Sequence, residues 1–181
     1  STVKSRKFTL TTAMYCYHHF ASISYLHQNP TTYMTDKVIF WGELSNLPSY
    51  FVYYYLKTND KKYFTPVEIL LKNISSKGIY DQLAGGIARY TVDENWIIPH
   101  FEKMLYDNIQ FINLLTKFYQ KTKNEYFKNK LKQTIQFINQ EFKNNLNLYG
   151  SAYDADSEGV EGKYYTWSYD ELKEILKENF F

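Results

Sequence analysis

Two polar segments hold most of the residues that could do chemistry. The first, residues 79–99, contains Asp81 followed by Gly85-Gly86, and the second, residues 144–165, contains Asp154 and Asp156. A carboxylate that is partly removed from water acts as a general acid or base, and aromatic faces form the walls of sugar pockets. Because Tyr164 and other aromatic residues adjoin these paired carboxylates, the pattern favours a sugar site.

The run that follows the first segment predicts a helix start with several reactive groups. On a helix, His100, Lys103 and Asp107 share one face, and Glu102 lies beside Tyr106 at a spacing of four. This arrangement places an imidazole, carboxylates and a cation together at the start of one helix. The alternative is a solvated first helical turn, in which a Glu lies near the positive helix end.

Metal and phosphate sites are not predicted. Gly85-Gly86 lacks the GxxxxGK[ST] phosphate-loop pattern and also fits a simple turn. The alternating acids before Gly159 faintly resemble a calcium loop, but its third acid is Glu158 and its last position is Tyr165. The HEXXH motif is absent, and the presence of a single cysteine, Cys16, argues strongly against a cysteine-based zinc site. We therefore expect no metal and no cofactor.

Hydrophobic spacing predicts an all-α chain with low Gly and Pro content. Helices are expected at residues 13–26, 44–57, 66–76, from 99 or 100 to about 121, at 125–143, and at 170–178 after the N-cap Ser168. A loop is expected at residues 28–35, and turns at 58–60 and 122–124. The polar segments would then connect helices, and a loop of such length within a compact domain is more often functional than not.

An internal repeat organises these helices into hairpins. Residues 57–64 resemble residues 121–127, and their Tyr-Phe pairs lie 63 positions apart. Each unit reads as helix, short turn, helix and long loop. Since a helical hairpin cannot bury its apolar stripe alone, hairpins of this kind stack, as in an α/α toroid. An ordinary helical bundle is the alternative.

Composition narrows the class of protein. The chain has 181 residues, a length that corresponds to about one domain. Its formal charge is +2, so it lacks the strongly basic face that nucleic-acid binding requires. No apolar run approaches 18 residues and no secretory leader is evident, so we expect no membrane partner and a cytoplasmic location. Aromatic residues make up 19%, an excess that fits compositional drift as well as sugar pockets.

Four motifs resemble the spermatogenesis-associated, thioredoxin-domain-containing protein family over residues 42–181. They are Gly78-Ile79-Tyr80-Asp81-Gln82-Leu83 with Gly85-Gly86; Arg89-Tyr90-x-Val92-Asp93-Glu94-x-Trp96; residues 99–108; and residues 151–167. The resemblance implies a partial (α/α)6 toroid, similar to N-acylglucosamine 2-epimerases and six-hairpin glycosidases, that is cut off after about two and a half hairpins. The family's thioredoxin-like domain is not matched by residues 1–40, so the chain resembles a fragment.

The resemblance implies carbohydrate chemistry, with epimerase or isomerase activity first and glycosidase activity second. His100 would move a proton, tuned by Glu102 and Asp107. The remaining roles are substrate contact or acid/base action for Asp81, Asp154 and Asp156, anion or hydroxyl binding for Arg89 and Lys103, and pocket walls for Tyr90, Trp96, Tyr106, Tyr164 and Trp167. A small carbohydrate and a separate chain with the remaining hairpins are the expected partners. The rival function is a non-catalytic scaffold for redox partners, and we expect this chain alone to be inactive.

Overall fold

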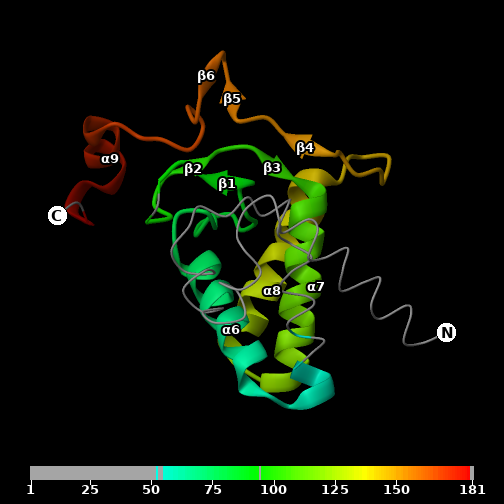
Figure 1. Cartoon of the computed structure of the whole chain (residues 1–181). Helices are drawn as coiled ribbons and strands as arrows, with labels where there is room; N and C mark the ends of the chain where they lie inside the picture. The colour runs from blue at the N-terminus through cyan, green and yellow to red at the C-terminus, as the bar shows by residue number, and fades with distance from the viewer. Residues whose placement is uncertain (1–51, 53–54, 94, 180–181) are drawn as a thin grey trace.

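The computed structural model describes residues 52, 55–93 and 95–179. The predictions for residues 13–26 and 28–35, most of 44–57, and Cys16 lie outside the described residues. Three long helices lie together, with the irregular segments at one end of them (Figure 1): α6 (Lys61–Ser76), α7 (Leu105–Thr122) and α8 (Glu125–Phe137). The described part is thus mostly helical, as predicted, and its membership of a toroid stays a prediction.

The core forms where the apolar faces of these helices meet. On α6 the buried side chains recur at spacings of three and four, which places them on one helical face. The same spacing recurs on α7, and the buried faces of both helices contribute to one hydrophobic cluster. The core includes Val67, Leu70, Leu71 and Ile74 of α6, Phe111, Leu114, Leu115 and Phe118 of α7, and Phe127 of α8.

The repeat is confirmed in the geometry of its two turns. Asn59 and Lys123 both adopt left-handed backbone conformations, with φ of 56° at each. The next residues, Asp60 and Asn124, cap α6 and α8 by accepting a hydrogen bond from the amide two residues later. Thr58 and the matching Thr122 also accept from these cap residues at 3.2 Å each. The turns therefore repeat at a spacing of 64, one more than the Tyr-Phe pairs.

The predicted start of α6 at Pro66 is wrong. The helix begins five residues earlier, at Lys61, because the Asp60 carboxylate accepts from the Lys62 amide at 3.0 Å and sets the N-terminus. Pro66 therefore lies inside the helix. A cap of this kind outweighs the preference of proline for the first helical position.

The predicted helix start at residue 99 or 100 is also wrong. These residues form β2 (Pro99–His100), which pairs with β1 (Tyr90–Thr91), and β3 (Lys103–Met104) pairs with β4 (Ala152–Tyr153). Strand pairing uses the backbone groups that a helical turn would need, so α7 starts only at Leu105. His100, Lys103 and Asp107 consequently do not share a helical face.

The later elements follow the predictions more closely. After α8 the chain continues as a π-helical turn, η1 (Ile138–Phe142), so the helical segment ends one residue before the expected position. The strands β5 (Asp156–Ser157) and β6 (Val160–Glu161) form a small hairpin. Ser168 caps α9 (Tyr169–Leu176) through a capping box, as its sequence predicts, and η2 (Lys177–Asn179) follows.

We call residues 77–104 the first loop and residues 143–168 the second loop. Both lie at the same end of the bundle in Figure 1, where β3 of the first loop pairs with β4 of the second. Within the described ranges, no helix has the length and apolar character needed to cross a membrane.

Candidate functional site

A pocket of about 260 Å³ lies where the first loop meets the second. Its lining combines apolar and polar residues of the first loop with one charged pair and several rings. These residues include Tyr80, Asp81, Pro99, Phe101, Lys103 and Tyr165. The pocket therefore brings together two predicted site residues, Asp81 and Lys103, from positions 22 residues apart.

The charged pair is the centre of this site. The Lys103 ammonium donates to Asp81 Oδ2 at 2.7 Å, and the two side chains are 5% and 16% exposed. Burial lowers the pKa of Lys103, although Asp81 opposes that effect. Burial by itself would raise the pKa of Asp81, but hydrogen bonds from Lys103 and the Ala84 amide hold it below its ordinary value. Asp81 is thus an ionised hydrogen-bond acceptor.

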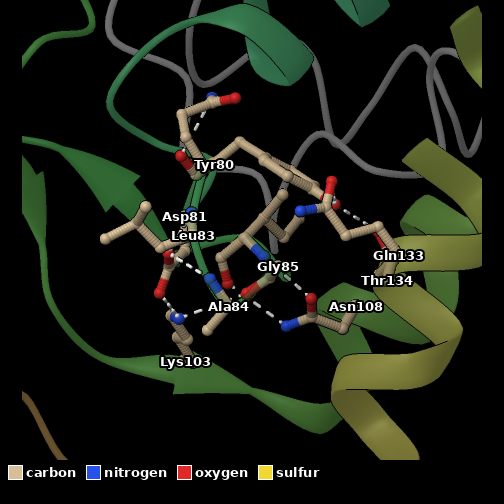
Figure 2. Close-up of polar contacts among 11 residues, drawn as sticks. Tyr80, Asp81, Leu83, Ala84, Gly85, Lys103, Asn108, Gln133 and Thr134 are labelled. Carbon is tan, nitrogen blue, oxygen red and sulfur yellow. Dashed lines mark hydrogen bonds and ion pairs between the residues drawn. The ribbon is translucent and has the colours of Figure 1, made fainter. Parts of the chain in front are cut away.

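A tight turn holds Asp81 in place, as Figure 2 shows. Asp81 Oδ1 accepts from the amides of Leu83 and Ala84 at 3.0 and 2.9 Å, and its backbone pairs with Gly85 and Gly86. The two glycines have φ of +92° and +80°. A Cβ at Gly86 would lie 2.4 Å from the Phe137 ring, so glycine is required there both for its conformation and for close packing.

Polar side chains that the sequence analysis missed anchor this turn to the helices. Asn108, buried on α7, accepts from the Ile87 amide at 2.8 Å and donates to the carbonyls of Ile87 and Met104. Gln82 donates to three carbonyls around the end of α6, and the Tyr80 hydroxyl lies 3.2 Å from the Thr134 hydroxyl. One usable signal existed: Asn108 is a polar residue in line with the apolar stripe of α7.

An aromatic pair forms one side of the pocket. The rings of Phe101 and Tyr165 stack with their centroids 5.3 Å apart. Gly162 permits this contact, because a Cβ there would lie 2.5 Å from the Phe101 ring. Burial raises the pKa of Tyr165 to about 12, so its hydroxyl stays protonated at neutral pH. Tyr165 was not among the predicted site residues.

His100 lies beside the pocket lining rather than in it. Its Nδ1 is 2.7 Å from Glu161 Oε1, and its ring stacks on Tyr90 with centroids 4.7 Å apart. Strand pairing places Tyr90 directly opposite His100, which explains the stack. Glu161 is a further partner that the sequence analysis missed. A carboxylate at Nδ1 fixes the orientation of an imidazole.

Glu102 and Asp107 occupy two different environments. Glu102 forms an ion pair with Arg89 at 3.1 Å. The Asp107 side chain is buried on α7, where burial raises its pKa to about 7, with Arg89 opposing and Glu102 adding to the shift. A carboxyl group that titrates near neutral pH is suited to proton transfer, but Asp107 does not line the pocket.

The other predicted site residues do not meet at the pocket. Trp96 is 1% exposed and belongs to the core. The remaining residues are exposed in the second loop or on α7: Tyr106, Asp154, Asp156, Tyr164 and Trp167. Asp154 accepts a hydrogen bond from the Asp156 amide in its own loop. Among the residues described, no group of three or more His, Cys, Asp or Glu side chains is placed to hold a metal ion.

Comparison with known proteins finds curated relatives that include three proteins of the same name. Spermatogenesis-associated protein 20 of Mus musculus is 35% identical over 114 residues, that of Rattus norvegicus 36% and that of Homo sapiens 33%. Each alignment covers 60% of this chain but 14% of the relative. No protein-family profile matches the chain. The similarity supports the spermatogenesis-associated part of the expected resemblance, whereas the thioredoxin-like domain and the toroid stay predictions. This chain spans a small part of those proteins' length.

Proposed function

We propose that this chain forms part of a sugar-binding site in a carbohydrate-processing domain, with a monosaccharide in the pocket beside Asp81. The observation that carries the proposal is the combination of a largely buried ion pair and a stacked aromatic pair in one pocket of about 260 Å³. Binding pockets are mostly apolar and contain a few well-placed polar groups. A sugar ring offers both kinds of contact, since its C–H face meets rings and its hydroxyls meet charged groups.

Epimerase or isomerase chemistry is the reaction that we propose first. Its proton carrier would be His100, oriented by Glu161 and lying between the pocket residues Pro99 and Phe101 in sequence. Hydrolysis is the second candidate, and the observation in its favour is that Asp81 itself lines the pocket. Either activity would belong to a longer protein of the thioredoxin-domain-containing kind, or to this chain together with a partner that carries further hairpins.

A non-catalytic scaffold is the alternative from another class. It is favoured by the fact that the acids of the first loop hold backbone in place. Asp81 accepts from two amides, and Asp93 accepts from those of Asn95, Ile97 and Ile98. A scaffold needs this network but has no need of a ligand, so sugar binding separates the two functions.

The test is a thermal melt of the full chain, followed by circular dichroism, with a panel of neutral monosaccharides. A bound sugar raises the melting temperature, because it binds the native state alone. Tyr165→Leu should reduce that rise, since it removes one ring of the stacked pair. Tyr149→Leu is the matched control, because Tyr149 is an exposed tyrosine that does not line the pocket. A melt that no sugar shifts would favour the scaffold.

A further inference from the structure

We infer that this pocket selects neutral sugars and rejects the matching uronic acids. The inference rests on the proposed sugar-binding function and adds the charge class of the ligand. It follows from which hydrogen-bonding atoms of the charged pair are already used. The atom left to meet a ligand is a negatively charged acceptor.

The Lys103 ammonium has little capacity left for a ligand. One N–H is donated to Asp81 Oδ2 at 2.7 Å, and a longer contact of 3.3 Å reaches the Gly85 carbonyl (Figure 2). The rings of Phe137 and Tyr165 lie 4.5 and 4.9 Å from Nζ. An ammonium has three hydrogens, so these contacts surround the group with protein. Lys103 therefore acts as an internal cation rather than as an anion receptor.

The Asp81 carboxylate keeps capacity to accept. Oδ1 already accepts two amide hydrogen bonds, whereas Oδ2 accepts from Lys103 alone among the described residues. A carboxylate offers about four lone-pair positions, so Oδ2 has room for one more donor. A sugar hydroxyl can donate there, and a second carboxylate cannot.

Nearby cations do not reverse this preference. Within the described residues, Asp81 and Lys103 are the charged groups that line the pocket, and their charges cancel. Arg89 is paired with Glu102, and the Lys130 ammonium donates to Gln82. A ligand carboxylate would lose water without gaining a counter-ion, and it would face Asp81 as a like charge.

The experiment measures affinities for three matched pairs by isothermal titration calorimetry. The probes are D-glucose, D-galactose and D-mannose, each compared with its own uronate, which differs only at C6. We expect the best neutral sugar to bind at least about tenfold more tightly than its uronate. Because the discrimination is electrostatic, 1 M NaCl should reduce the ratio.

Asp81→Asn changes the net charge of the pair from zero to positive. It removes one negative charge and leaves Lys103 uncompensated, so the preference should move toward the uronate by about tenfold or more. Asp170→Asn on α9 is the matched control and should leave the ratio unchanged. If the Asp81 variant does not fold, the wild-type ratio at low and high salt decides alone.

The outcomes separate the two proposals. A wild-type preference for a uronate overturns the charge class and leaves sugar binding intact. An equal affinity within each pair does the same. If none of the six probes binds, sugar binding fails, and the charge class fails with it.

Discussion

The first and second loops are built from the same residue types but differ in burial. Each contains a lysine–carboxylate pair, glycines with positive φ and several aromatic residues. In the first loop the paired side chains Lys103 and Asp81 are 5% and 16% exposed, whereas Lys163 and Glu158 of the second loop are 51% and 75% exposed. Only the first loop places its pair against the helices.

The difference teaches that the helices, not the loop composition, decide which residues form a site. The first loop is fixed to α7 by Asn108 and to α6 by Gln82. The second loop reaches the pocket through Tyr165, while Asp154 and Tyr164 remain in solvent. Hydrogen bonds and ion pairs are stronger once they are removed from water, and a buried polar group that loses its partner costs more stability. Substitutions at matched positions in the two loops should therefore have unequal effects.

Gly86→Ala should produce the largest loss of stability. The alanine must adopt a positive φ, and its Cβ would lie 2.4 Å from the Phe137 ring. Backbone strain and overpacking together should lower the free energy of unfolding by about 3–4 kcal/mol. Gly159→Ala in the second loop meets nothing within 4 Å, so only the backbone cost of about 1–2 kcal/mol remains. Urea unfolding of both variants measures the difference, and equal losses would show that the first loop is not packed as described.

Lys103→Met should come next. The change keeps the length of the side chain but leaves the partly buried Asp81 carboxylate without its cation, at a cost of about 2–3 kcal/mol. Lys163→Met breaks an exposed pair and should cost less than about 1 kcal/mol. The two unfolding free energies are compared at pH 7. A loss at Lys163 as large as that at Lys103 would contradict the comparison of the two loops.

Asp107 should make stability depend on pH. Its folded-state pKa of about 7 lies above the ordinary value of 3.8, so the native state binds more protons between these values. The stabilisation that Asp107 contributes is then fully present below about pH 4 and is lost as the pH rises through 7, by about 2 kcal/mol between pH 5 and 7. Asp107→Asn should flatten this slope. An unchanged slope would assign the pH dependence to other groups.

The sequence predicted the presence of the helices, but it predicted the starts of α6 and α7 wrongly and the site only in part. Apolar spacing and the caps at Asn124 and Ser168 are local signals, so α8 and α9 start within a residue of their expected positions. The start of α7 depends instead on pairing of residues 103–104 with residues 152–153, a contact between distant segments that no local pattern contains. Asp81 and Lys103 were predicted from their residue types within the motifs. Tyr165, Glu161 and Asn108 were missed, because their roles depend on contacts with distant segments.

The smallest expected effect is a difference in stability between substitutions at two adjacent tyrosines of the second loop. Tyr165 stacks on Phe101, so Tyr165→Leu should cost about 1 kcal/mol through loss of the aromatic pair. Tyr164 is 75% exposed, so Tyr164→Leu should change stability by less than about 0.5 kcal/mol. Thermal unfolding of both variants checks the ranking. A reversed ranking would mean that the second loop contacts the rest of the protein through Tyr164, and the pocket would then lose its aromatic side.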